Sequence, residues 1–313
     1  MLHQLYRLEK HSHIDRSHLI KFKFNGRIYE GFKGDTLASA LLANGVRFIA
    51  RSFKFHRPRG IFTSGSEEPC ALVQINSGAE STPNQRATMV DIFDGLEANS
   101  INVWPGLNID LLSINDHLSM LFPAGFYYKT FISPSFLWPT YEQLIRKSAG
   151  LGCVPSVADS SRYEKHNIHC DILIIGGGIA GLSAALTAEK SGARVVLVEE
   201  QSHLGGNYFD SEGSIDGIPI STWVSNIENQ IIKNASCRIL KRTTAVIHSD
   251  HNFVVLNQKN QDSLGSQTSD FSPRERLWKV RARQVIYATG TLEKPLVFMN
   301  NDRPGVMLAR SVS

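Results

Sequence analysis

The chain has 313 residues, enough for roughly two domains of ~150 residues each. Hydrophobic residues make up 42% and charged residues 20%, which excludes global disorder, and 33 Lys and Arg against 29 Asp and Glu leave a net charge of +4, too small to indicate nucleic-acid binding. No run reaches the ~18 apolar residues of a membrane helix, and the charged N-terminus lacks the apolar region of a signal peptide. These features predict a cytoplasmic globular protein without a membrane segment. The scattered cysteines predict neither a disulfide framework nor a metal site; they are Cys70, Cys153, Cys170 and Cys237.

The N-terminal part reads as a polar arm followed by a small α+β domain. Residues 1–18 are charged and histidine-rich, as in a solvated tail. From residue 19, two alternating runs flank Asn25-Gly26, the strongest short signal for a β-hairpin. A helix over Leu37–Asn44 follows, with Asp35 or Thr36 as its N-cap and Gly45 as its stop. With a further strand near Cys70–Ile75, residues 19–100 predict a ferredoxin-like (β-grasp) domain.

Residues 101–168 lack regular periodicity and are rich in aromatic residues and proline, such as Trp104-Pro105 and Trp138-Pro139. We expect a long connector whose aromatic side chains pack on its neighbours. An exposed apolar connector of this kind could equally be covered by a partner chain.

Residues 169–313 begin with a βαβ pattern. An apolar strand over Asp171–Ile175 precedes an Ala- and Leu-rich helix over Ile179–Ser191 and a second apolar strand over Arg194–Glu199. A helix near 221–233 and several short strands follow, the last two over Leu277–Ala282 and Gln284–Ala288. The pattern predicts an α/β Rossmann-like domain.

The turn between the first strand and the helix carries the most information. Gly176, Gly178 and Gly181 form a GxGxxG motif, in which the glycines permit a tight turn, close approach of a pyrophosphate and close helix–strand packing. The N-terminus of the helix offers free N–H groups to phosphates. Glu199 ends the second strand, where a carboxylate accepts hydrogen bonds from an adenosine ribose, and Gly205-Gly206 follows.

This half-site predicts the chemical class of the ligand. A carboxylate at Glu199 would repel a 2′-phosphate, which disfavours NADP. NAD and FAD share the adenosine diphosphate, so the motif leaves both open. Near the C-terminus, the apolar strand Gln284–Gly290 returns to the nucleotide sheet, and since such domains normally add another strand and helix, we expect an incomplete domain.

Beyond these motifs, the chain resembles the N-terminal third of the alpha subunit of heterotetrameric sarcosine oxidases from about residue 19 onward. The stretches that carry the resemblance, besides the dinucleotide motif, are 34–41, 54–60, 68–69, 123–131, 145–152 and 301–309. The resemblance implies NAD binding in a complex with beta, gamma and delta subunits that demethylates sarcosine to glycine and reduces oxygen to hydrogen peroxide. FMN and FAD belong to the assembled complex, and the folate-binding domain of the family has no counterpart in these residues.

The resemblance also implies site residues, none of them catalytic. The family's NAD contacts map onto Gly176, Gly178, Ala180, Gly181, Glu199, Glu200, Gln201, Gly206, Asn207 and either Ala245 or Val246. In related ferredoxin-like modules four cysteines hold a [2Fe–2S] cluster, whereas only Cys70 remains around residues 60–72, so we expect no cluster.

Two other functions stay open. A stand-alone FAD- or NAD-dependent oxidoreductase would need a second dinucleotide motif, which the sequence lacks. The other is a non-catalytic assembly subunit with a vestigial nucleotide site, which would need no motif beyond those in this sequence. The nucleotide site offers no acid–base pair or nucleophile, and the resemblance implies that sarcosine is oxidised at the FAD of the beta subunit. We therefore expect the isolated chain to be inactive.

Overall fold

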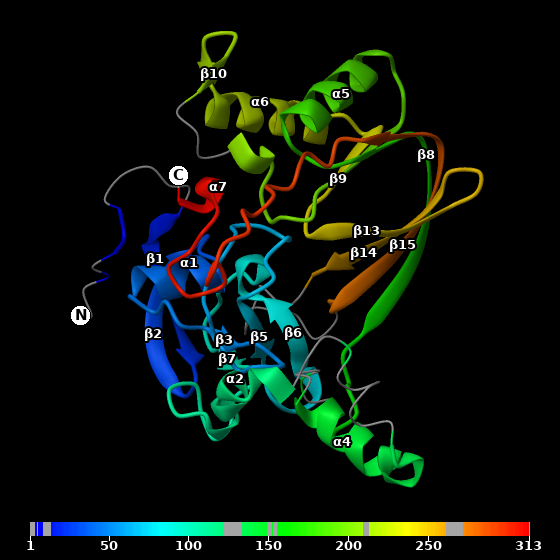
Figure 1. Cartoon of the computed structure of the whole chain (residues 1–313). Helices are drawn as coiled ribbons and strands as arrows, with labels where there is room; N and C mark the ends of the chain where they lie inside the picture. The colour runs from blue at the N-terminus through cyan, green and yellow to red at the C-terminus, as the bar shows by residue number, and fades with distance from the viewer. Residues whose placement is uncertain are drawn as a thin grey trace. The chain divides into compact units, whose positions relative to one another are not determined.

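The computed structural model describes residues 4, 6–8, 14–121, 125, 133–148, 152, 155–208, 213–260 and 272–312. The chain divides into two compact units. One contains Ile14–Ser160 and Glu293–Ser313 together with the first eight residues, and the other contains Ser161–Leu292. Each unit has its own sheet and core (Figure 1).

The first unit is built on a five-stranded sheet in the order β2-β1-β7-β5-β6. The hairpin turn is Asn25-Gly26, and both residues have positive φ (49° and 77°), as a type I′ turn requires. Strand β1 runs parallel to β7, which places the ends of the domain next to each other in the sheet. The strands are β1 (Asp15–Phe24), β2 (Arg27–Lys33), β5 (Leu72–Ile75), β6 (Thr82–Arg86) and β7 (Glu97–Ser100), with a separate pair β3 (Ala50–Arg51) and β4 (Pro58–Arg59).

Helix α1 (Leu37–Ala43) covers this sheet with its apolar face. Thr36 is its N-cap, in a capping box with Ser39, and Gly45 follows the helix with a φ of 78°. Leu37, Ala40 and Leu41 are fully buried against Phe22 and Val73. The predicted helix is therefore confirmed, with Thr36 as the N-cap.

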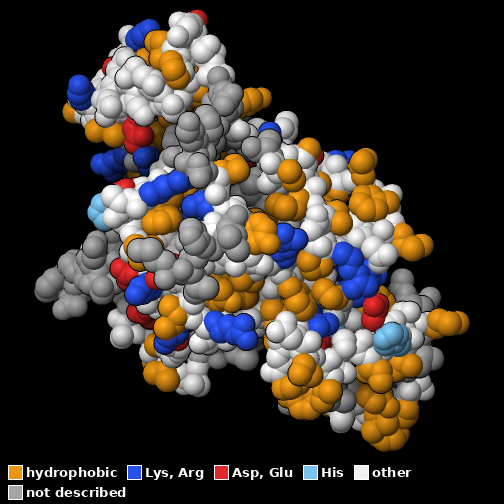
Figure 2. All heavy atoms as spheres, turned by 90° about the vertical axis from the view of Figure 1, so that its left-hand side faces the viewer, with side chains coloured by type: hydrophobic (Ala, Val, Ile, Leu, Met, Phe, Trp, Pro, Cys, Tyr) orange, Lys and Arg blue, Asp and Glu red, His pale blue; other side chains and the backbone are white. Residues whose placement is uncertain are grey.

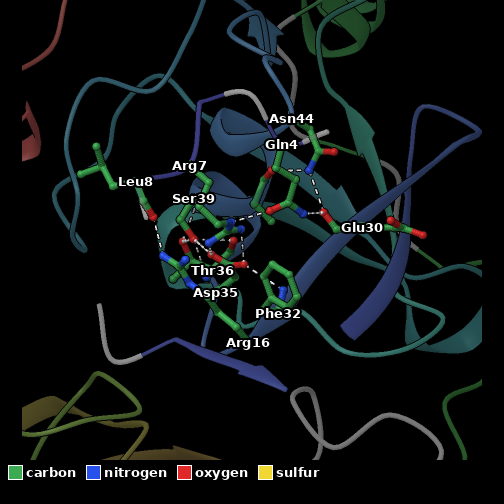
Figure 3. Close-up of polar contacts among 11 residues, drawn as sticks. Gln4, Arg7, Leu8, Arg16, Glu30, Phe32, Asp35, Thr36, Ser39 and Asn44 are labelled. Atoms are coloured by element: carbon green, nitrogen blue, oxygen red, sulfur yellow. Dashed lines mark hydrogen bonds and ion pairs between the residues drawn. The ribbon is translucent and has the colours of Figure 1, made fainter. Parts of the chain in front are cut away.

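Part of the expected polar arm is ordered onto the first unit, which corrects the prediction of a solvated tail. The Arg7 guanidinium donates to both oxygens of the buried Asp35 carboxylate, at 3.1 and 2.6 Å (Figure 3). Gln4 donates to the Glu30 carbonyl at 2.7 Å, and β1 begins already at Asp15. An unpaired Asp35 would be costly to bury, so Arg7 ties the arm to the start of α1.

The expected connector contains short helices rather than irregular chain alone. They are η3 (Leu111–Ser113), α2 (Ile114–His117), η4 (Ser119–Leu121), η5 (Ser135–Leu137) and α4 (Trp138–Ser148). Several of its apolar side chains are exposed, among them Ile109 at 72% and Met120 at 94%. Figure 2 shows groups of hydrophobic side chains on one face, with Lys and Arg side chains between them. Much of the aromatic stretch 122–132 lies outside the described residues.

The second unit is a six-stranded sheet in the order β12-β9-β8-β15-β14-β13. The first four strands run parallel, while β14 and β13 continue antiparallel as a meander. Helices α5 (Ile179–Lys190) and α6 (Ile220–Lys233) cover one face of the parallel strands. The strands are β8 (Tyr163–Ile175), β9 (Val195–Val198), β12 (Cys237–Leu240), β13 (Thr243–Ser249), β14 (Phe253–Lys259) and β15 (Glu275–Tyr287).

Two long strands, β8 and β15, join the parallel part of this sheet to the antiparallel part. We expected a strand of five residues from Asp171, but β8 begins at Tyr163 because β15 pairs with it over its whole length. For the same reason the two short strands expected over 277–288 form one continuous strand. Val254 and Leu256 of β14 and Trp278 of β15 then pack in one cluster with Leu173 and Val196, on the face opposite the helices.

The C-terminal segment differs from the expected domain boundary. Glu293–Ser313, expected to belong to the Rossmann-like domain, is grouped with the first unit. Arg57 and Arg59 both pair with Asp302, and Leu308 donates its N–H to the Phe62 carbonyl at 2.9 Å. The remaining short elements are η1 (Gly78–Glu80), η2 (Ala87–Met89), η6 (Gly206–Tyr208), β10 (Ser214–Ile215), β11 (Ile218–Pro219) and α7 (Ala309–Val312). No helix among the described residues is long and apolar enough to cross a membrane.

Candidate functional site

The GxGxxG turn joins β8 to α5, and each of its glycines meets a different spatial demand. Gly176 has a φ of 109°, and a Cβ there would lie 2.3 Å from the Ala288 carbonyl oxygen. A Cβ at Gly181 would lie 1.8 Å from the Gly176 carbonyl oxygen, so only glycine lets the helix approach the strand this closely. A Cβ at Gly178 would meet nothing within 4 Å. The motif therefore combines two tightly packed glycines with one that borders open space.

The open position lies at the N-terminus of α5. Gly178 is the N-cap and supplies no side chain to the first N–H groups of the helix. The first such groups of any α-helix lack partners within the helix and carry partial positive charge. Ala180, in the first turn, is exposed, whereas Gly181 is buried. Backbone N–H groups without a side chain above them can approach a pyrophosphate closely.

Glu199 connects the turn to the end of β9. Its Oε2 accepts a hydrogen bond from the Gly177 N–H at 2.7 Å, and its Oε1 accepts one from the Gln201 N–H at 2.9 Å. The side chain is buried, and burial raises the pKa of its carboxyl group, while the neighbouring Glu200 carboxylate acts in the same direction. A carboxylate has about four acceptor positions, so Glu199 retains capacity for ribose hydroxyl groups.

The double glycine lies against the turn. Gly205 forms a bridge with Gly178 and donates its N–H to the Gly177 carbonyl at 2.9 Å. Gly206 has a φ of 57°, and its Cβ would lie 3.2 Å from the Gly178 Cα. Asn207 follows, exposed, in η6. The structure thus brings Gly206 and Asn207 to the open side of the turn.

Strand β13 starts beside the acidic end of β9. Thr243 donates its N–H to the Glu199 carbonyl at 2.8 Å, and Arg242 donates to the Gln201 carbonyl at 3.0 Å. Ala245 is half-buried against the core, whereas the pairing shifts register between Ala245 and Ile247 and leaves Val246 exposed. The two candidate adenine contacts therefore differ: Val246 is the one that faces out from the irregular strand.

Sequence reasoning missed two parts of this arrangement. Gly177 occupies a position of the motif to which the spacing assigns no role, yet its N–H donates to the Glu199 carboxylate and orients it. The end of β15 was assigned to the sheet, but the Ala288 carbonyl also fixes the conformation needed at Gly176. The triple glycine was the available signal for the first, because a Cβ at Gly177 would lie 2.6 Å from the Leu204 side chain.

Comparison with known proteins identifies a separate family for each of the two predicted domains. Residues 17–102 match the family described as "2Fe-2S iron-sulfur cluster binding domain", and residues 171–288 match "FAD dependent oxidoreductase". The chain is 47% identical over 97% of its length to sarcosine oxidase subunit alpha of Rhizobium meliloti, and 34% identical over 96% to that of a Corynebacterium species. The chain spans only 31% and 26% of the length of those proteins. The part that it matches is their N-terminal third, as the sequence motifs predict.

A solved structure supports the fold. L-proline dehydrogenase from P. horikoshii covers 93% of this chain with a TM-score of 0.57, at 20% identity and over 44% of its own length. The expected combination of a ferredoxin-like domain and a Rossmann-like domain is thereby confirmed. The resemblance to the N-terminal third of sarcosine oxidase alpha subunits is confirmed as well.

The two implied cofactors fit the residues differently. The turn fits a dinucleotide, since Gly178 leaves the N-terminus of α5 open and Glu199 is held beside it. An iron–sulfur cluster needs four thiolates, and the loop over 60–71 has Cys70 alone. Among the residues that the structure describes, no group of three or more His, Cys, Asp or Glu side chains lies together as metal ligands would. The residues of the ferredoxin-like domain do not fit a cluster.

Proposed function

We propose that this relative of the sarcosine oxidase alpha subunits is a subunit, or the N-terminal part of one, of a cytoplasmic flavoenzyme complex. The complex would demethylate sarcosine to glycine oxidatively and reduce oxygen to hydrogen peroxide, with beta, gamma and delta subunits as partners. The observation that carries the proposal is the 47% identity over 97% of the chain with one such alpha subunit. FMN and FAD in the assembled complex would supply the electron transfer.

The role that we propose for this chain is to bind NAD. The N–H groups at the start of α5 would hold the pyrophosphate above Gly178, and Glu199 would accept hydrogen bonds from the adenosine ribose. Glu200 and Gln201 lie beside that carboxylate, Gly206 and Asn207 border the open side, and Val246 or Ala245 would contact the adenine. None of these groups is a paired acid and base or a nucleophile, and the family resemblance implies that the bound NAD takes no part in turnover.

The whole function can be tested with reconstituted protein. We expect no peroxide from sarcosine when the isolated chain is supplied with FAD, FMN and NAD. Peroxide should appear when the chain is joined to the remaining two thirds of its relatives' length and combined with a matching beta subunit. Turnover by the isolated chain at roughly 1 per second or more would contradict the assignment.

A second candidate is that the same site holds FAD in an oxidoreductase that works alone. The match of residues 171–288 to FAD-dependent oxidoreductases favours it. The two candidates differ in a simple observable, because a chain that binds FAD should retain yellow flavin absorbance through purification. A colourless chain that takes up NAD would support the first candidate.

A further inference from the structure

The loop over residues 60–71 belongs to a domain of the iron–sulfur class but is organised around a carboxylate. Glu68 is 1% exposed. Its Oε2 accepts hydrogen bonds from the N–H groups of Phe62 and Thr63, at 2.9 and 2.6 Å. Its Oε1 accepts from those of Cys70 and Ala71, at 2.7 and 2.8 Å. Four backbone donors from both limbs of the loop therefore converge on one side chain.

The residues around this carboxylate follow a recognisable spacing. Plant-type [2Fe–2S] proteins hold their cluster with a C-x4-C-x2-C run and a distant fourth cysteine. In this loop the same spacing falls on Thr63, Glu68 and Ala71. The Thr63 hydroxyl also donates to Glu68, at 3.3 Å, so the residues at the first and third positions, Thr63 and Ala71, both contact the carboxylate of the second. Cys70 lies at none of these positions, which corrects its assignment as the remaining cluster residue.

The segment Ala87–Thr88, distant in sequence, forms hydrogen bonds with this loop. Thr88, which is buried, donates its hydroxyl to the Gly65 carbonyl at 2.7 Å. The preceding Ala87 donates its N–H to the Ala71 carbonyl at 2.9 Å. Thr88 is therefore a residue from outside the loop whose side chain contacts it, as the distant fourth cysteine of the plant-type proteins does.

Burial explains why an internal anion is needed. Converging backbone N–H groups form concavities that bind anions, including iron–sulfur clusters. The N–H groups of Thr63 and Ala71 are buried and those of Phe62 and Cys70 partly so, and leaving them without acceptors would be costly. A buried carboxylate is equally costly unless it is fully hydrogen-bonded. The Glu68 carboxylate provides acceptors for the backbone N–H groups of the loop, and these groups provide the donors that a buried carboxylate needs.

We propose that the Glu68 carboxylate has replaced the cluster as the resident anion of this loop, with Thr63, Glu68, Ala71 and Thr88 at the four ligand positions. The replacement keeps the loop in place without iron. It also explains why β5 starts at Leu72, since the N–H groups of Cys70 and Ala71 are directed to Glu68 rather than to a strand.

The first test restores the four ligands in the full chain. We expect T63C/E68C/A71C/T88C, after anaerobic incubation with ferrous iron and sulfide, to take up about two iron atoms per chain, with visible absorbance and a paramagnetic signal on reduction. A matched control shifts the loop cysteines by one position as S64C/P69C/L72C/T88C. The proposal is overturned if the control binds iron as well as the first variant, or if the first variant folds but binds none.

A second test needs no iron and covers the case in which four substitutions prevent folding. Glu68→Gln removes the charge and turns amide N–H groups toward donors of the loop. We expect amide hydrogen exchange at Phe62, Thr63, Cys70 and Ala71 to become at least about tenfold faster. Glu67→Gln makes the same change at a side chain that is not fully buried and should leave these rates unchanged. Unchanged rates in Glu68→Gln would overturn the proposal.

Discussion

Two loops of this chain gather backbone N–H groups beside a buried glutamate, and they differ in what those groups bind. In the loop over 60–71, the Glu68 carboxylate accepts from four N–H groups of that loop. In the turn after β8, Glu199 accepts from Gly177 and Gln201, while Gly178 leaves the start of α5 open. Hydrogen bonding of backbone N–H groups to a buried carboxylate therefore uses the donors of the first loop internally, whereas in the second it leaves the N–H groups at the start of α5 open to a ligand.

The difference comes from where the carboxylate is attached. Glu68 lies within its own loop and can reach both limbs. Glu199 directly follows the neighbouring strand β9, so it reaches Gly177 in the turn but leaves the helix N-terminus uncovered. Because the Glu199 side chain comes from outside the turn, it orients the turn but leaves the N–H groups at the start of α5 uncovered.

The largest effect should come from the packed glycine of the turn. Gly181→Ala places a methyl group 1.8 Å from the Gly176 carbonyl oxygen, and backbone atoms cannot move away cheaply. We expect a loss of about 3 kcal/mol or more in the free energy of unfolding, measured by urea denaturation, and no nucleotide binding. Ser183→Ala, at an exposed position on the same helix, is the control and should change stability little. Wild-type stability in Gly181→Ala would show that the helix does not pack this closely.

The open glycine should behave in the opposite way. Gly178→Val places its side chain in space that holds no other atom within 4 Å of the Cβ, and the φ of −70° suits any residue. The variant should fold like the wild type but bind NAD at least about tenfold more weakly in calorimetry, because the side chain would cover the phosphate-binding N–H groups. Undiminished affinity would place the pyrophosphate elsewhere.

Glu199→Gln should have an intermediate effect on both folding and selectivity. The amide can no longer accept from two N–H groups, so we expect a loss of about 1–3 kcal/mol in stability and a smaller preference for NAD over NADP. Paired titrations of NAD and NADP measure the second effect. Glu97→Gln, on β7 in the first unit and outside the proposed site, is the control and should leave the preference for NAD unchanged.

The Glu199 carboxyl also predicts a pH dependence. Its pKa is raised by burial in the folded chain, so the folded state holds this proton more tightly than the unfolded state. The stability that this group contributes is therefore greatest below its ordinary pKa of 4.5 and declines as the pH rises from there through the raised value. Glu199→Gln should remove that decline from unfolding measured against pH.

The smallest effect is expected at the surface. Hydrogen bonds from the Arg194 side chain, and then from its backbone, lower the pKa of Asp171 from 3.8 to about 2. Its contribution to stability is present above pH 3.8 and is lost as the pH falls toward 2. Asp171→Asn should flatten the pH dependence of unfolding in this window alone. An unchanged profile would mean that solvent screens the pair completely.

Much of the fold follows from local patterns in the sequence. The Asn25-Gly26 turn, the capped helix after Thr36 and the strand–turn–helix at Gly176 are each specified by neighbouring residues, and all three are present. The length of β8 and the continuity of β15 are set by their pairing with each other. Long-range pairing of this kind leaves no periodic signal in either segment.

For the candidate site, too, the sequence predicts the parts that depend on neighbouring residues and misses the parts that depend on distant ones. Glycine spacing and the strand-end carboxylate point to the turn, because those residue types are needed at fixed positions. The role of Glu68 depends on both limbs of its loop and on Thr88, and the docking of Arg7 on Asp35 joins residues 28 apart in sequence. Hydrophobic patterning carries no information about which buried polar groups will meet.

The central claim is that the turn after β8 binds an adenine dinucleotide without a 2′-phosphate. Isothermal titration of the purified chain with NAD and with NADP, under identical conditions, tests it most directly. We predict one site per chain for NAD and at least about tenfold weaker binding of NADP. Binding of NADP as tight as that of NAD would contradict the role of Glu199, and with it the assignment of this site.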